Sequence, residues 1–366
     1  MLAHNWDELS RTLRAGLTLG LLLAAQGLAG WVLLARPRST AWGESAAAFL
    51  ALAAGASIAL VSQTYHLGGD FRTFLLTWCL LVLPLAFLFE SHLTAAIVWV
   101  LAFLRAWGPS WQRSDDAWFW ALAAAGALYF VLAAKRAERD WRLPMLAGVA
   151  TVVLVLGGTA TVGTGWYAIP VLYLGGVLGF LYAAGVPAAG REATGWMRVL
   201  RGMAVPAIAL CSLLGTYDFP WEHGVRRHEW MWHTGVLVGV ALGAIGLVRG
   251  LRSLRESRWD EALFAGALVP ATLGVAAALA GNVAVAMLVF NAYLAALGLA
   301  TLGRGLGEGR LGATNVGLIL LTTLASARFF DADLSFLARG IGFILVGLAF
   351  LGVNVYLVRR RGEVTP

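Results

Sequence analysis

Residues 283–302 have the sequence VAVAMLVFNAYLAALGLATL, twenty residues without one charged side chain. About 20 consecutive apolar residues are enough for a helix to cross the roughly 30 Å hydrocarbon core of a bilayer. Runs of this kind recur along the whole chain. The sequence therefore predicts an all-α, polytopic integral membrane bundle of thirteen transmembrane helices, at residues 13–34, 45–66, 72–89, 92–108, 117–134, 143–162, 166–186, 198–216, 231–249, 261–280, 283–302, 312–329 and 336–358.

The composition leaves little room for a folded soluble domain. Hydrophobic residues make up 60% of the 366 residues and charged residues 13%, with a mean hydropathy of +0.76. Soluble proteins have about 25% charged residues. Spans of about 20 residues use roughly 260 residues of this chain, so we expect one transmembrane domain over residues 1–366. Cys79 and Cys211 both fall inside apolar runs, which argues against a disulfide framework.

The distribution of arginine predicts the orientation. The odd-numbered loops and the C-terminal tail carry 18 of the 27 basic residues, and the N-terminus and even-numbered loops carry 9. Short loops rich in Lys and Arg stay in the cytoplasm during insertion. We therefore expect the N-terminus outside and the C-terminus in the cytoplasm.

The same counting identifies the expected partners. The acidic residues divide 10 and 10, so the net charge of +7 splits into +8 on the inner face and −1 on the outer face. A basic rim confined to the cytoplasmic side is typical of contact with anionic lipid headgroups and argues against nucleic acid. A chain with 26 arginines, one lysine and abundant alanine is typical of a GC-rich bacterial genome. A membrane-protein partner or a homo-oligomer is compatible with this sequence.

Candidate substrate-binding residues gather at the predicted outer ends of the spans. Polar groups deep in the spans are neutral, such as Gln26, Ser57 and Asn291, and the missing midplane carboxylates argue against ion coupling. Three outer segments are rich in His, Asp and Arg: residues 63–70, 217–223 and 328–333. Polar groups at helix ends that face one compartment often line a crevice. The predicted site residues are Gln63, Tyr65, His66, Asp70, Asp218, Arg328 and Asp331.

Each of these residues also has a structural interpretation. Arg328 and Asp331, three residues apart, can form a local ion pair, and Asp333 can cap the thirteenth span. A metal site built on His223, His228 and His233 is disfavoured, because residues five apart on a helix point about 140° away from each other. We therefore predict no metal or other cofactor.

Two internal patterns accompany the spans. Trp118-Phe119-Trp120 and Trp230-Met231-Trp232 open two spans that lie four spans apart, which predicts a parallel repeat of residues 117–218 and 230–333. Chance similarity between helices rich in Ala, Leu and Gly is the alternative. Glycines also recur every fourth residue at Gly235, Gly239 and Gly243 and at Gly175 and Gly179, a spacing that lets helices pack closely.

Several segments resemble an uncharacterised family of bacterial predicted membrane proteins, domain of unknown function 2157. The most specific element is SQTYHLGGD at residues 62–70. The resemblance implies a multi-spanning protein of the inner membrane and no particular activity. Family members typically have a cytoplasmic helical segment and one more span before the Asn5-Trp6 element, and we expect this chain to lack both. The other segments with the resemblance are Ala3–Asp7, Trp78, Phe290–Tyr293, Thr314–Gly317, Arg328–Asp331 and Arg339–Phe343.

Three functions are compatible with these features. The first is a transporter or carrier of a neutral or amphipathic, lipid-like substrate, with an outward-facing polar crevice. The second is a membrane enzyme that acts on a lipid-linked substrate at the outer leaflet, which requires two of the outer aspartates within about 10 Å. The third is a membrane scaffold or assembly subunit without a substrate of its own.

Overall fold

The computed structural model describes residues 9–107, 116–162, 168–221 and 233–331, with a few more helical residues between 344 and 355. These residues form helices joined by short loops and contain no strand. The chain divides into two compact units. The N-terminal unit comprises Met1–Thr164, Pro187–Leu200 and His233–Gly235, and the C-terminal unit comprises Gly165–Val186, Arg201–Trp232 and Val236–Pro366. The prediction of a helical membrane fold is confirmed in this coarse form.

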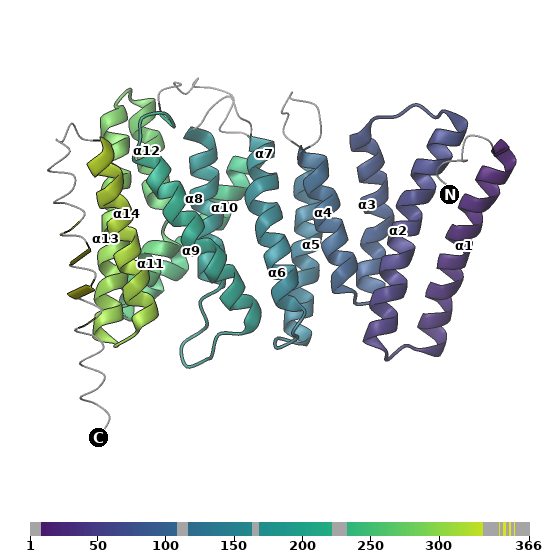
Figure 1. Ribbon diagram of the computed structural model, residues 1–366, viewed down its shortest axis with the longest axis horizontal. Helices are drawn as coiled ribbons and strands as arrows, with labels where there is room; N and C mark the ends of the chain where they lie inside the picture. The colour runs from purple at the N-terminus through teal and green to yellow at the C-terminus, as the bar shows by residue number, and fades with distance from the viewer. Residues whose placement is uncertain are drawn as a thin grey trace. The chain divides into compact units, whose positions relative to one another are not determined.

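The first half of the chain forms eight helical segments, α1–α7 and one π-helical turn, and Figure 1 shows how they follow one another. The π-helical turn and α7 continue α6 without a break, so Leu143–Val162 is one apolar candidate span. Adjacent helices pack in sequence order, α1 on α2, α2 on α3 and α3 on α4. The bounds are α1 (Arg11–Ala35), α2 (Thr40–Tyr65), α3 (Phe71–Leu88), α4 (His92–Trp107), α5 (Ala117–Arg136), α6 (Leu143–Val152), the π-helical turn (Val153–Gly157) and α7 (Gly158–Val162).

The second half forms seven more helices, and the first residues of α9 and α10 are counted with the N-terminal unit. α13 packs on α14 and α12, and α12 also packs on α8. The bounds are α8 (Ala168–Ala184), α9 (Gly195–Gly215), α10 (Thr234–Arg255), α11 (Trp259–Ala265), α12 (Leu268–Leu279), α13 (Val283–Gly307) and α14 (Leu311–Asp331).

Eight helices of the described residues are long and apolar enough to cross a membrane, or nine if the bent pair α11 and α12 is one span. α4 has 16 residues, about 24 Å at 1.5 Å per residue, and is shorter than the usual span. The predicted thirteenth span, residues 336–358, falls mostly outside the described residues. The count of thirteen therefore stays a prediction, as do the single domain and the repeat, whose first copy crosses the boundary between the units.

The predicted tenth span, residues 261–280, is broken. α11 and α12 meet at an angle of 50°, and Gly266 and Ala267 lie between them. Pro270 has no N–H to offer the carbonyl of Gly266, and its ring clashes with that carbonyl in a continuous helix. The Tyr293 hydroxyl donates to the Leu263 carbonyl at 3.0 Å and so ties α13 to the end of α11.

Glycines let α8 and α10 approach closely in the C-terminal unit, as their spacing predicts. A Cβ atom on Gly176 would lie 2.0 Å from the carbonyl oxygen of Gly239. One on Gly243 would lie 2.6 Å from the Cα atom of Gly176, and one on Gly179 would lie 2.7 Å from the carbonyl oxygen of Ala265. The two helices and the broken pair are therefore packed backbone against backbone.

Candidate functional site

Four of the predicted site residues lie at the junction between α2 and α3. Gln63 and Tyr65 are on the last turn of α2, His66 ends that helix in the left-handed conformation (φ 51°), and Asp70 caps α3. All four side chains are exposed. Asp70 accepts hydrogen bonds from the backbone N–H and the hydroxyl of Thr73, both at 2.8 Å, which lower the pKa of Asp70 below its ordinary value. His66 and Asp70 thus have structural roles in this turn, and their contact with a substrate stays a prediction.

The other predicted site residues belong to the C-terminal unit. Arg328 on α14 donates to the carbonyl and the hydroxyl of Thr216 at the end of α9, both at 3.0 Å. Its guanidinium lies 5.0 Å from the ring centroid of Tyr217. The residue that follows Tyr217 in the chain is the exposed Asp218. Asp331 is the last residue of α14, and its side chain lies outside the described residues. The structure therefore joins Arg328 to the segment that contains Asp218.

The disfavoured metal site is only partly described. His223 and His228 lie outside the described residues, and His233 precedes α10. Within the described ranges, no three His, Cys, Asp or Glu side chains gather in a way that could hold a metal ion.

A polar cluster that the sequence did not predict lies in the N-terminal unit, where the α3–α4 turn meets the α5–α6 loop. Glu44, on the first turns of α2, accepts hydrogen bonds from the backbone N–H groups of His92 and Leu93 at 2.9 and 3.0 Å and from the Ser91 hydroxyl. Arg142 donates to Glu44 at 2.7 Å. A carboxylate at a helix N-terminus is stabilised by the free N–H groups and the helix dipole there, so Glu44 anchors α4 to α2.

Arg142 also holds Asp140 in a bidentate ion pair. Its Nη2 and Nε atoms lie 2.7 and 3.1 Å from the two carboxylate oxygens. This charge-assisted pair holds the pKa of Asp140 below its ordinary value and raises the pKa of Arg142. Both groups are therefore charged at neutral pH.

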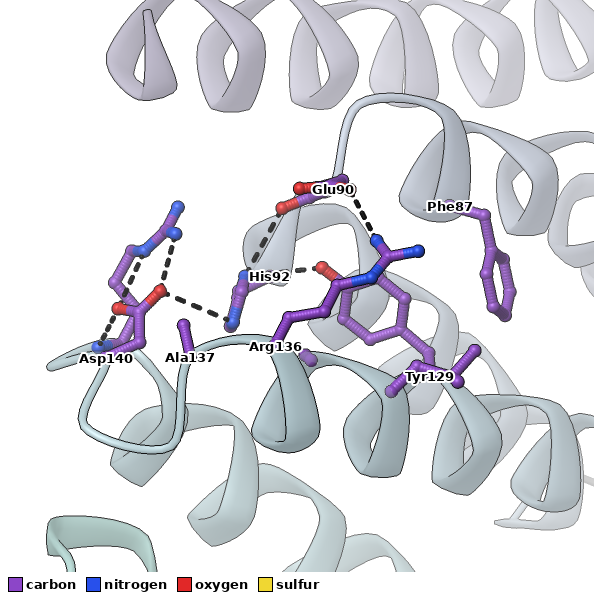
Figure 2. A pocket seen from close by; sticks show the side chains of 10 residues that line it. Phe87, Glu90, His92, Tyr129, Arg136, Ala137 and Asp140 are labelled. Atoms are coloured by element: carbon purple, nitrogen blue, oxygen red, sulfur yellow. Dashed lines mark hydrogen bonds and ion pairs between the residues drawn. The ribbon is translucent and has the colours of Figure 1, made fainter. Parts of the chain in front are cut away.

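His92 occupies the centre of the cluster (Figure 2). Its Nδ1 atom lies 3.2 Å from the Tyr129 hydroxyl and 3.3 Å from the Glu90 carbonyl oxygen. Its Nε2 atom is buried, has no hydrogen-bond partner in the described part of the protein, and lies 3.8 Å from Asp140 Oδ2. Buried polar atoms are normally paired, so Nε2 marks a position that a ligand or water can satisfy.

These side chains line a cavity of about 190 Å³, which we call the His92 pocket. Figure 2 shows an ion pair between Glu90 and Arg136 beside it, and these two side chains are 67% and 62% exposed. Deeper groups are mostly enclosed, with 7% of the His92 side chain and 12% of the Asp140 side chain exposed. The lining residues are Phe87, Glu90, His92, Tyr129, Leu132, Ala133, Arg136, Ala137, Asp140 and Arg142.

Two further ion-pair networks connect the ends of neighbouring helices. In the N-terminal unit, Asp116 accepts from Arg72 at 2.8 Å and from Arg105 at 3.3 Å while capping α5. In the C-terminal unit, Arg304 on α13 lies 2.8 Å from Asp260 and 3.0 Å from Glu261 on α11. Each charged side chain in the two networks contacts at least one opposite charge, and these contacts join the helix ends.

The apolar helices, with charge confined to their ends, define a helical integral membrane protein. Residues 1–95 match the model of the family described as Predicted membrane protein (DUF2157). The resemblance inferred from the sequence is thereby confirmed over this range, which contains the SQTYHLGGD element and His92. No curated protein sequence and no solved structure gives a significant match.

Proposed function

We propose that this protein is a carrier of the bacterial inner membrane that moves a neutral or amphipathic, lipid-like substrate. The observation that supports it best is the broken helix pair α11 and α12, bent by 50° in the C-terminal unit. Carriers commonly use interrupted helices, because a break frees backbone groups for a substrate within the membrane. All charged side chains of α1–α14 lie within about two turns of a helix end, which suits an uncharged or amphipathic substrate better than an ion.

The proposal includes the topology and the site predicted from the sequence. The chain crosses the membrane thirteen times, with the N-terminus outside and a basic cytoplasmic rim in contact with anionic headgroups. Its protein partner is a second copy or another membrane protein. At the outer face, the substrate contacts Gln63, Tyr65, His66, Asp70, Asp218, Arg328 and Asp331.

Flux in proteoliposomes tests this proposal. Dithionite destroys a fluorescent label on outer-leaflet phospholipid only, so a vesicle without a carrier keeps the label of its inner leaflet. We expect the purified protein to expose that label, and the triple variant His66→Ala, Asp70→Ala, Asp331→Ala to lose this activity. The control variant is Glu192→Ala, at an exposed loop position. Flux in the triple variant equal to that of the control would refute the predicted substrate-binding site.

The same assay separates the two other functions. A chemically altered lipid, detected by mass spectrometry, would indicate the enzyme that acts at the outer leaflet. A protein that neither moves nor alters lipid and that co-purifies with another membrane protein would indicate the scaffold.

A further inference from the structure

We infer that the His92 pocket binds the headgroup of a phospholipid that ends in a primary ammonium group, with Asp140 and His92 as its acceptors. This inference rests on the proposed function, because it names the class of amphipathic substrate. The His92 pocket is then a second site besides the proposed one at the outer face. It lies at helix ends that the sequence predicts to face the cytoplasm.

The charges at the inner end of the pocket favour a cation: Asp140 and Arg142 line the pocket, and Glu44 lies behind them on Arg142. Two carboxylates, Glu44 and Asp140, share one guanidinium, that of Arg142. Their side chains are only 17% and 12% exposed, and a buried charge is costly unless it is paired. The N–H groups at the start of α4 and the Ser91 hydroxyl also stabilise Glu44. These three side chains together nevertheless carry one excess negative charge, and an ammonium group bound at Asp140 neutralises it.

The His92 ring supplies the second acceptor. When Nδ1–H donates to the Glu90 carbonyl at 3.3 Å, Nε2 carries a lone pair. Nε2 and Asp140 Oδ2 are then two acceptors 3.8 Å apart. One ammonium group with N–H···O and N–H···N distances of about 2.9 Å can donate to both. A trimethylated ammonium group has no N–H and cannot.

The rim of the pocket suits the rest of the headgroup. Arg136 is 62% exposed and forms an ion pair with Glu90, which is 67% exposed, and such surface ion pairs contribute little stability. The guanidinium is therefore available to a phosphate, and the exposed Lys135 and Arg139 are its neighbours in the sequence. Phe87 and Leu132 form an apolar wall for the glycerol end. Pockets for drug-sized ligands measure about 300–1,000 Å³, so about 190 Å³ suits a headgroup while the acyl chains stay in the bilayer.

Native mass spectrometry of the full-length protein in detergent tests the inference. The ligands are three phospholipids with the same acyl chains and with ethanolamine, choline or glycerol headgroups. We expect the ethanolamine lipid to bind about tenfold or more tightly than the other two. This factor corresponds to the one charge-assisted hydrogen bond that the other headgroups cannot form. Equal affinity for all three would overturn the inference.

Two variants locate the binding. Asp140→Asn removes the excess charge, and Leu132→Trp fills the cavity while keeping every charge, so the test stands even if the first variant fails to fold. Both are expected to abolish the preference, whereas the control Glu308→Gln, in the C-terminal unit, should keep it. A preference that survives Leu132→Trp would place the lipid elsewhere and contradict the inference.

Two further arms separate the remaining possibilities. Displacement of the lipid by equimolar phosphoethanolamine would assign the site to a soluble compound with the same chemistry and overturn the lipid assignment. Binding is measured without vesicles, so it is independent of flux. Selective binding without flux would refute the carrier and leave the pocket, and flux without selective binding would refute the pocket alone.

Discussion

The close contact between α8 and α10 predicts a large effect of one methyl group. In Gly176→Ala, the added Cβ would lie 2.0 Å from the carbonyl oxygen of Gly239, whereas non-bonded heavy atoms prefer about 3.5 Å or more. The neighbouring atom belongs to the backbone and cannot rotate away, so the helices must separate by about 1 Å or more. Overpacking costs about 1–3 kcal/mol and occasionally more. We expect the upper end, about 3 kcal/mol of unfolding free energy.

The matched control is Gly202→Ala on α9, where an added Cβ has nothing within 4 Å. There the higher helix propensity of alanine adds about 1 kcal/mol of stability. At about 2–4 °C per kcal/mol, Tm of the detergent-solubilised protein should fall by about 6–12 °C for Gly176→Ala and rise by about 2–4 °C for Gly202→Ala. Shifts of the same sign and size in the two variants would refute the close packing of α8 and α10.

Two other predictions concern the ion pairs. Arg304→Met leaves the buried Asp260 without its ion-pair partner and Glu261 with Arg258 alone, and should cost about 3–5 kcal/mol. Arg310→Met removes an exposed pair and should cost at most about 1 kcal/mol; thermal unfolding in detergent compares the two variants, and equal losses would contradict the network. The pKa of Asp140 is lower in the folded protein than its ordinary value of 3.8, so its ion pair with Arg142 adds stability that is present above that pH and is lost as the pH falls below it. Tm measured from pH 6 to pH 3 should therefore fall less steeply in Asp140→Asn, and parallel curves would show that the pair adds nothing.

The helices were predictable because their signal is local. Twelve of the thirteen apolar runs coincide with helices of the described residues, since a run of about 20 apolar residues has one stable conformation in a membrane. The close approach at Gly239 and Gly243 followed from their spacing. The orientation relative to the membrane remains a prediction, because it depends on loop charge.

The bend between α11 and α12 was missed although its cause is visible in the sequence. Hydropathy averages over Gly266 and Pro270, which are both tolerated within apolar runs. Their four-residue separation, with the proline opposite the glycine carbonyl, was the signal for a break. Hydropathy alone therefore predicts the location of a span and not its straightness.

The His92 pocket could not be found from spacing. Glu44, His92 and Asp140 come from three separate helix ends, and about 100 residues separate the first from the last. Each resembles an ordinary polar residue of a loop or helix terminus. His92 was the single histidine on the predicted inner side, and this was the only available hint. The predicted outer residues come from three short segments, and closeness within a segment is a weaker guide to a site than spatial convergence.

The most direct test of the proposed topology is the sidedness of two loops. Single cysteines at Ser110 and Glu138, in a variant without Cys79 and Cys211, can be labelled in intact cells with a membrane-impermeant maleimide. The arginine distribution predicts that Ser110 is labelled from outside and that Glu138, in the loop next to the His92 pocket, is labelled only after the membrane is opened. Labelling of both positions from the same side would contradict the orientation and the cytoplasmic location of the pocket.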